Sequence, residues 1–570
     1  MPKSTLSRFS KQVAGRDAVV TESAATLLAH ACVQRLIDLG VKHAVLAPGS
    51  RNAPISILLA QAEQQGLLTL HVRIDEREAA FLALGLSKLS GIPTLLCCTS
   101  GTAAANFAPA VAEAFYSQVP MIVLTADRPE GAAQRGASQT IRQDQLYAAN
   151  VLASFTIGTG ADHHVAADRA RVAWSAACGP QRGPVHVNIH LAEPLLASHV
   201  EWPALREAEP FDISEAAHVD SPPFDLPTLG NRPVMVIGDI PQHERSVVQC
   251  ALDFAVTVGI PVLMEPTAGS RDARVAVRRH ALMTDAASEG ITSVISLGRF
   301  GLGRHLRRLC ERANTHIAFA AEGLGADPFA TATKVLKLAR AEPVLTALQS
   351  TLEVEPTWLQ SWHTADERAS MHVQSVLEST TAAPSGLHVA AEVLEFAAHH
   401  NALVFAAASR SIRDVDVMAD FAGPTVVANL GVNGIDGLIS TAAGVALSQQ
   451  QHTYLLIGDI AFLHGSNGLL NVAGEAPAPL TVVVVDDNGG AIFSDLEQGA
   501  EEFQPWFERV FGTPHNMNLV NVARGYGVNA VGVETRAELA AQLATRTPGV
   551  IVVKAANREQ SRNLRAQLQS

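Results

Sequence analysis

The chain has 570 residues, of which 48% are hydrophobic and only 5% aromatic, and its formal net charge is −13. A field of this sign would not attract nucleic acid or an anionic membrane, so neither is expected as a general partner. No apolar run reaches the roughly 18 to 20 residues of a membrane span, and the polar first residues lack the apolar core of a secretory signal. We therefore expect a cytoplasmic protein.

Short apolar runs alternate with helix-like segments along the chain, which predicts parallel sheets covered by helices. Strands are expected at 44–46, 68–74, 94–98, 121–125 and 184–189 in a first unit, at 234–237, 262–264, 293–297 and 317–320 in a second, and at 403–406, 425–427, 454–457, 480–485 and 549–553 in a third. Helices are expected at 23–39, 79–88 and 103–116, and Pro-rich or Ser/Thr-rich linkers at 194–233 and 379–386. The prediction is an α/β protein with three doubly wound parallel-sheet domains, at 1–200, 201–385 and 386–570.

Two acidic residues end neighbouring predicted strands of the third unit. Asp459 follows the run 454–457, and Asp487, 28 positions later, lies in the Asp-Asp-Asn-Gly-Gly that ends the run 480–485. Because the carboxyl ends of parallel strands lie side by side, the two carboxylates can converge on one point. Hard oxygen ligands suit Mg²⁺ or Ca²⁺, and Mg²⁺ usually takes one or two carboxylates plus phosphate oxygens. A helix predicted at 460–467 would offer free N–H groups to a diphosphate.

This pattern resembles the metal-diphosphate motif of thiamine-diphosphate (ThDP) enzymes, a Gly-Asp-Gly followed downstream by Asn-Asn. Here the first part reads Gly-Asp-Ile at 458–460, and the second reads Asp-Asp-Asn at 486–488. The run 234–237 also ends in Gly-Asp, at Asp239. However, Thr267, which lies at the same spacing from Asp239, is not acidic and has no paired glycines. Asp459 is therefore the expected metal ligand.

Two further residues fit the needs of ThDP. The cofactor requires a carboxylate on its pyrimidine ring, in a mostly apolar pocket, so that its own imino nitrogen can act as a base. Glu76 lies at a strand end before an Ala-rich helix and suits this task; the alternative is a solvated glutamate favoured by the helix dipole. Ile435, among glycines at 433–437, suits the bulky wedge that bends the cofactor; the alternative is a core isoleucine.

Arginines gather where predicted strands end. They are Arg51, Arg128, Arg410 and Arg413 in the outer units, with Arg304 and His305 in the middle unit. A guanidinium binds a carboxylate through two parallel hydrogen bonds, so the set predicts substrates that carry several carboxylates. Each arginine by itself is more often an ion-pair partner on the surface.

Seven segments together resemble one enzyme family: PGSRNAPI (48–55), DEREAAFLALGLSK (75–88), TSGTAAAN (99–106), TADRP (125–129), GASQTIRQ (136–143), NGIDGLISTAAG (433–444) and DDNGGAIF (486–493). They are similar to segments of the 2-succinyl-5-enolpyruvyl-6-hydroxy-3-cyclohexene-1-carboxylate (SEPHCHC) synthases, ThDP enzymes of menaquinone biosynthesis. The resemblance covers both outer units, and the middle unit matches loosely. It implies decarboxylation of 2-oxoglutarate and conjugate addition of the remaining succinyl carbanion to isochorismate.

The resemblance also implies roles for individual residues. Glu76 would activate the cofactor, and Asp459, Asp487 and the Gly489 carbonyl would hold Mg²⁺, with Mn²⁺ as a substitute. The remaining implied contacts are, for ThDP, Ile435, Gly458, Ile460 and Ala461, and, for the substrates, Ser50, Arg51, Arg128, Gln139, Arg304, His305, Ser409 and Arg413. Gln139, Ser409 and Arg413 join Glu76 as the implied catalytic set. A homodimer or dimer of dimers is expected, in which Glu76 of one chain meets Asp459 of another.

Three positions depart from the family pattern. Asp487 stands where many members have Asn, Leu430 where many have Arg, and His305 where a second basic residue is often found. Two alternatives remain at this point: another ThDP carboligase or 2-oxo acid decarboxylase, such as an acetolactate-synthase-like enzyme, and a catalytically silent regulatory subunit. Retention of Glu76 together with both aspartates argues against the silent subunit.

Overall fold

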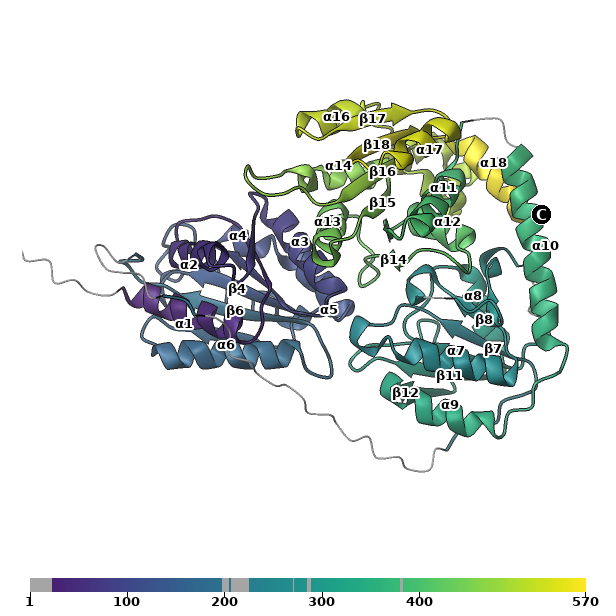
Figure 1. Ribbon diagram of the computed structural model, residues 1–570, viewed down its shortest axis with the longest axis horizontal. Coiled ribbons are helices and arrows are strands. Elements are labelled where there is room, and N and C mark those ends of the chain that lie inside the picture. Colours follow the sequence, from purple (N-terminus) through teal and green to yellow (C-terminus); the bar gives the residue numbers. More distant parts are fainter. Residues whose placement is uncertain are drawn as a thin grey trace, which may run out of the picture.

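The computed structural model describes residues 23–196, 204–206, 225–269, 271–283, 289–379 and 383–569. It contains three six-stranded parallel sheets, and buried apolar clusters lie on both faces of each sheet, under its helices. Figure 1 shows the N-terminal unit on one side of the molecule and the central and C-terminal units together on the other. The predicted class, three doubly wound α/β units, is confirmed.

The N-terminal sheet has the order β2-β1-β3-β4-β6-β5. Its strands are β1 (His43–Leu46), β2 (Thr69–Val72), β3 (Thr94–Cys98), β4 (Met121–Asp127), β5 (Ser154–Ile157) and β6 (Pro184–His190). The helices are α1 (Ala24–Asp38), α2 (Ala53–Gln64), α3 (Glu76–Lys88), α4 (Thr102–Ala105), α5 (Ala108–Tyr116) and α6 (His163–Ala177). Helices α1, α2 and α6 cover one face, and α3 and α5 cover the other.

The central sheet has the order β12-β11-β10-β7-β8-β9, which is the strand order of dinucleotide-binding folds. Its strands are β7 (Pro233–Ile237), β8 (Val262–Met264), β9 (Ala276–Val277), β10 (Ser293–Leu297), β11 (Thr315–Ala320) and β12 (Lys334–Lys337). Helices α7 (Val247–Val258), α8 (Arg304–Arg312) and α9 (Ala341–Gln349) flank it. The long α10 (Trp358–Ser379) then runs along the side of the molecule toward the C-terminal unit (Figure 1).

The C-terminal sheet has the order β14-β13-β15-β16-β18-β17, the same arrangement as the N-terminal sheet. Its strands are β13 (Leu403–Ala406), β14 (Val426–Val427), β15 (Thr453–Gly458), β16 (Leu480–Asp486), β17 (Ala530–Val533) and β18 (Gly549–Lys554). Its helices are α11 (Gly386–His399), α12 (Arg410–Met418), α13 (Leu438–Gln449), α14 (Asp459–His464), α15 (Gln504–Phe507), α16 (Leu519–Gly525), α17 (Arg536–Ala544) and α18 (Arg558–Gln569). The two outer units therefore share one topology.

Three local expectations were wrong. The single helix expected at 103–116 is two helices, α4 and α5, because Pro109 cannot donate to the carbonyl of Ala105. The helix expected at 460–467 ends at His464, and a 3₁₀ turn, η6 (Ser466–Leu469), follows. Four strands were not expected: β5, β9, β12 and β17. Each lies at a sheet edge, where a strand is short or only partly buried and carries no continuous apolar run.

The expected domain limits stay predictions. The limit at 200/201 lies outside the described residues, as do most of the first linker and residues 380–382 of the second. Among the described residues, no helix combines the length and apolar character needed to cross a bilayer. The cytoplasmic location stays a prediction as well.

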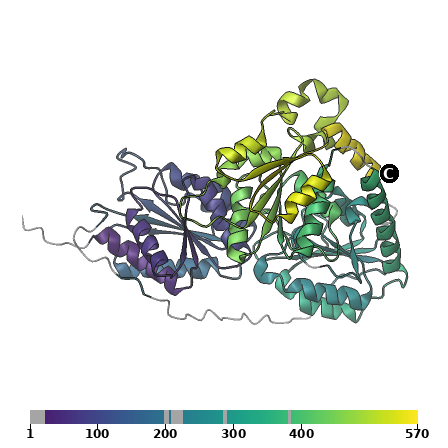
Figure 2. The same cartoon turned by 45° about the horizontal axis from the view of Figure 1, so that its top comes forward.

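Helices α3 and α13 join the two outer units within one chain, and they lie side by side in Figures 1 and 2. Small residues allow the close contact. A Cβ on Gly85 would come within 2.1 Å of the carbonyl oxygen of Thr441, and a Cβ on Gly444 within 2.4 Å of that of Leu82. The Gly-rich and Ala-rich character of both segments is therefore a packing requirement, and it places the start of α3 against the C-terminal unit.

Candidate cofactor and active site

A cavity opens where β13, β15 and β16 end, at the carboxyl edge of the C-terminal sheet. Parallel α/β sheets bind ligands at this edge. The cavity is lined by eight of the predicted residues, Ser409, Ile435, Gly458, Asp459, Ile460, Ala461, Asp487 and Gly489, and by neighbours that include Arg410 and Phe493. The diphosphate and metal residues expected from the sequence thus surround one space.

Asp459 is the most tightly held of these residues. It is only 2% exposed, its Oδ1 accepts the N–H of Ile460 at 2.6 Å, and its Oδ2 accepts the N–H of Gly489 at 2.8 Å. The Gly489 contact joins the ends of β15 and β16, as the spacing of Asp459 and Asp487 predicts. Gly489 has a φ of +137°, and a Cβ there would lie 2.0 Å from the carbonyl oxygen of Gly512. Glycine is therefore required at this position.

Sequence reasoning missed two residues beside Asp459. Asp486 and His515 lie close enough to Asp459 for one ligand atom of each to fall within 4.8 Å of the others. His515 Nδ1 accepts the N–H of Met517 at 3.0 Å, so its Nε2 carries the proton and donates to Asp459 Oδ2 at 3.2 Å. Asp486 could have been noticed as the first residue of the motif. His515 lies on a distant loop with no spacing signal.

The acidic cluster is electrostatically poised for a cation. Burial, together with Asp459, raises the pKa of Asp487 to about 8, and the same two causes raise the pKa of Asp486. Carboxylates held this close repel one another, and a divalent cation would relieve the repulsion. The donor set is rich in carboxylate oxygens and would fit a hard divalent metal ion.

The N-terminal unit contacts the C-terminal unit on either side of Glu76. Glu76 begins α3, and its neighbours bond to the C-terminal unit of the same chain: Asp75 accepts from Asn467 Nδ2 at 2.8 Å, and Arg77 donates to the carbonyl of His464 at 2.9 Å. The Glu76 carboxylate itself is half-buried, and none of the described residues forms a hydrogen bond to it. Ile435 projects from the loop before α13 and is half-buried.

Comparisons with known proteins agree with this geometry. Residues 27–147 match the thiamine pyrophosphate enzyme N-terminal TPP binding domain, and residues 419–555 match the corresponding C-terminal TPP binding domain. A SEPHCHC synthase of Kineococcus radiotolerans is 36% identical over 553 residues, which cover 93% of this chain and 95% of that protein. Another, of Thermobifida fusca, is 38% identical over 541 residues, which cover 90% of this chain and 93% of that protein.

The chain belongs to the SEPHCHC synthase family. It is a thiamine-diphosphate enzyme, as the sequence predicted. A third relative in the family, from Rhodococcus erythropolis, is 35% identical over 569 residues, covering 95% of this chain and 99% of that protein, so the similarity includes the central unit.

On the N-terminal side, the residues that the SEPHCHC synthase pattern assigns to substrate follow β1 and β4, and Gln139, in the loop after β4, donates to the carbonyl of Ser100 beyond the end of β3. Arg128 donates to Ser100 Oγ at 2.7 Å and to the carbonyl of Gln139 at 2.8 Å, and Gln139 has a φ of +58°. Arg51 donates to the carbonyl of Leu191 at 3.0 Å, and the exposed Ser50 precedes it. The structure thus gathers these four predicted residues at one sheet edge.

On the C-terminal side, Ser409 and Arg413 form a pair at the start of α12. Ser409 has a φ of +71°, an unfavourable conformation for a residue other than glycine, of the kind found at functional sites. Its carbonyl accepts from Arg413 Nη1 at 2.5 Å. Ser409 lines the cavity and Arg413 does not, and burial lowers the pKa of Arg413.

The two predicted residues of the central unit do not line the cavity. Arg304 is exposed at the start of α8. His305 faces inward, and its Nε2 lies 2.9 Å from Nδ1 of His280. Burial lowers the pKa of His305 to about 3, so its ring is neutral at physiological pH. His305 therefore does not replace the positive charge expected at its position.

Asp487 leads to a pH-dependent prediction. Because its pKa is raised to about 8 in the folded chain, its protonated form is favoured by folding. The contribution of this protonated carboxyl to the free energy of unfolding is complete below the ordinary aspartate pKa, near 4. It is lost as the pH rises through about 8. We expect Asp487→Asn to raise the melting temperature of the metal-free chain at pH 8 and to leave it nearly unchanged at pH 4.

The same substitution should weaken metal binding, because the metal requires the ionised carboxylate. Titration calorimetry with Mg²⁺ and ThDP should show wild-type affinity rising with pH, by up to about tenfold per unit between pH 6 and 8, and a flatter profile in Asp487→Asn. If the metal affinity of the two proteins changed with pH in the same way, Asp487 would not titrate as described.

Proposed function

We propose that the chain catalyses the reaction for which its family is named, with 2-oxoglutarate and isochorismate as substrates. The observation that carries the proposal is the cavity where Asp459, Asp487, Gly489 and Ile435 meet. Glu76, whose carboxylate has no hydrogen-bond partner among the described residues, begins α3, which packs on α13 of the same chain. Bound ThDP supplies a nucleophilic carbon and an electron sink for decarboxylation of a 2-oxo acid. The curated relatives bear the SEPHCHC synthase name, which favours this reaction over that of an acetolactate-synthase-like enzyme.

The proposed metal is Mg²⁺, with Mn²⁺ as a substitute. Asp459, Asp487 and the Gly489 carbonyl would be its protein ligands, and the metal would neutralise the charge of the diphosphate. Ile460 and Ala461 line the cavity; the N–H of Ala461 would face the diphosphate, whereas that of Ile460 donates to Asp459 Oδ1. His515 would orient the Asp459 carboxylate from behind, as residues around metal ligands commonly do.

Glu76 is proposed to hold a proton between its carboxylate and the pyrimidine nitrogen of the cofactor. Its half-buried position and its lack of a described hydrogen-bond partner leave the carboxylate available for that contact. Desolvation by α13 and by the apolar wall at Ile435 would strengthen the bond. Ile435 would hold the two rings of the cofactor at the angle that the reaction needs.

The arginines are proposed to bind the substrate carboxylates. Arg128, with Ser50, Arg51 and Gln139, lies at the N-terminal sheet edge and would take isochorismate. Arg413 and Ser409, with Arg304, would meet the carboxylates of 2-oxoglutarate and of the product. Charge-assisted hydrogen bonds of this kind contribute roughly 1.5 to 3 kcal/mol each.

The active assembly is proposed to be a homodimer, or a dimer of dimers, with shared sites. Two apolar side chains close to the site are uncovered in the single chain: Ile74 is 68% exposed and Val432 is 49% exposed, and a second copy would cover them. In a shared site, α3 of one chain would pack on α13 of its partner as it packs here on α13 of its own chain.

Mixing two inactive variants distinguishes these arrangements. If sites are shared, co-refolded Glu76→Gln and Asp459→Ala chains form mixed dimers that contain one intact site. Random mixing makes half of the dimers mixed, so about a quarter of all sites should recover activity. If both residues come from one chain, every site carries a lesion and the mixture stays inactive despite subunit exchange.

The proposed reaction is tested by supplying the chain with ThDP, Mg²⁺ and 2-oxoglutarate, with and without isochorismate, and measuring CO₂ and product by mass spectrometry. We expect CO₂ release to be much faster with isochorismate, and one adduct to form per CO₂. Pyruvate in place of 2-oxoglutarate is the control. Faster turnover of pyruvate, with acetolactate as product, would support the alternative enzyme.

A further inference from the structure

The loop between β14 and α13, which carries Ile435 to the cavity, is held by side chains from outside its own unit. Glu113, on α5 of the N-terminal unit, is 1% exposed. Its Oε1 accepts the N–H of Gly431 at 2.8 Å, and its Oε2 accepts the N–H of Val432 at 2.7 Å. One buried carboxylate thus binds two successive peptide groups of the loop.

The central unit holds the same loop from the other side. Arg299, in the segment after β10, donates from Nη1 to the carbonyl of Gly431 at 3.0 Å. Glu113 and Arg299 therefore bind both ends of the peptide group that joins Gly431 to Val432. A Cβ on Gly431 would lie 2.8 Å from Glu113 Oε2, so only glycine fits this position without a shift.

These contacts dominate the hydrogen bonding of the loop. Among the described residues, the hydrogen bonds found for 431–436 are the two from Glu113 and the one from Arg299. The loop forms no helix or strand between β14 and α13, and Asn433 has a φ of +56°. The Gly431–Val432 peptide group, three residues before Ile435, is thus held by residues from two other units.

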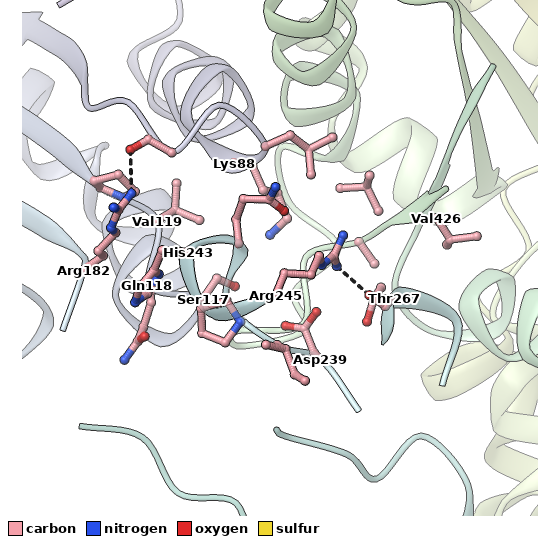
Figure 3. Close-up of a pocket in the computed structure, with 18 residues that line it drawn as sticks. Lys88, Ser117, Gln118, Val119, Arg182, Asp239, His243, Arg245, Thr267 and Val426 are labelled. Carbon is pink, nitrogen blue, oxygen red and sulfur yellow. Dashed lines mark hydrogen bonds between the residues drawn. The ribbon is translucent and has the colours of Figure 1, made fainter. Parts of the chain in front are cut away.

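The Glu113 carboxylate is supported in turn. Ser117 Oγ donates to its Oε1 at 2.7 Å, and Lys88 Nζ, on α3, lies 4.0 Å from the same oxygen. Figure 3 shows Lys88 near Asp239 and Arg245, in the region where the three units meet. Arg299 Nη2 lies 3.8 Å from Asp239 Oδ2, so charged groups link the two sides of the loop.

We propose that Glu113 and Arg299 are positioning residues that clamp the 431–435 loop and thereby set Ile435 against the cofactor. The inference rests on the proposed function, because Ile435 matters only if ThDP binds in the cavity. A clamp built from two other units would make the bend of the cofactor depend on how the three units are docked.

The test combines hydrogen exchange of the ligand-free chain with kinetics at saturating ThDP. The variants are Glu113→Gln and, in case that buried change prevents folding, Arg299→Met, whose side chain is partly exposed. Glu538→Gln is the matched control: Glu538 Oε2 also accepts two backbone N–H groups, from Glu534 at 2.8 Å and Thr535 at 3.1 Å, far from the site.

In both loop variants we expect amide exchange at 431–432 to accelerate about tenfold or more. The kcat should fall about tenfold while the KM for 2-oxoglutarate changes by less than about twofold, and the control should change neither. The proposal would be wrong if amide exchange at 431–432 did not change, or if it became faster while kcat did not change. If the proposed function were wrong, the unmodified chain would show no turnover. The exchange measurement does not depend on turnover, so it would still test the clamp.

Discussion

Glu76→Gln is expected to lower turnover at least about a hundredfold, the usual scale for removal of an acid–base contribution. The amide is nearly isosteric with the carboxylate, and Glu76 makes no described hydrogen bond in the ligand-free chain, so the fold and much of the ThDP binding should persist. An amide cannot share a proton with the pyrimidine nitrogen in the same way. The measurement is kcat at saturating substrates, beside ThDP affinity by calorimetry.

Glu559→Gln provides the control for this prediction. Glu559 is also an acidic residue in the first turn of a helix, α18, and it is exposed. If Glu76 only interacted favourably with the helix dipole, the two variants would behave alike, and each would keep nearly all of its turnover. Near-normal turnover of Glu76→Gln would remove Glu76 from the mechanism.

Asp459→Ala is expected to abolish metal-dependent ThDP binding. The substitution removes a proposed metal ligand and also leaves the N–H of Gly489 and Nε2 of His515 without their acceptor. Because those groups are buried, we also expect a lower melting temperature, with a cost of roughly 1 to 3 kcal/mol for the donors left unpaired. Calorimetric titration with ThDP and Mg²⁺ measures the first effect, and thermal unfolding measures the second.

Asp239→Ala is the matched control, since Asp239 also follows a Gly at the end of a parallel strand. Its backbone pairs with Arg299 in an isolated antiparallel bridge, and the described residues offer no metal-binding group around it. ThDP binding should survive this substitution. Equal losses in the two variants would mean that the metal has been assigned to the wrong strand.

The fold was predictable from the sequence where strands are buried. The site was predictable where a motif follows the end of such a strand. Strands β3, β8, β10 and β13 have the expected limits because each is a fully buried apolar run. Asp459, Asp487 and Gly489 line one cavity because the carboxyl ends of neighbouring parallel strands must meet. Residues that follow neighbouring parallel strands therefore lie close together, even when they are far apart in the sequence.

Features that depend on contacts between units could not be predicted. His515 reaches Asp459 from a loop with no regular spacing, and Glu113 bonds to peptide groups, which leave no mark on the loop sequence except a required glycine. His305 was expected near substrate because the family resemblance implied that role. Its ring instead turns toward His280, a partner that only the tertiary fold supplies.

The most direct measurement is a structure of the chain with ThDP and Mg²⁺ bound. The account predicts that a Glu76 carboxylate, from the same chain or its partner, lies within about 3 Å of a pyrimidine nitrogen. It also predicts Asp459, Asp487 and the Gly489 carbonyl on the metal, and Ile435 between the two rings of the cofactor. A cofactor bound elsewhere, or one whose pyrimidine meets no Glu76, would contradict it.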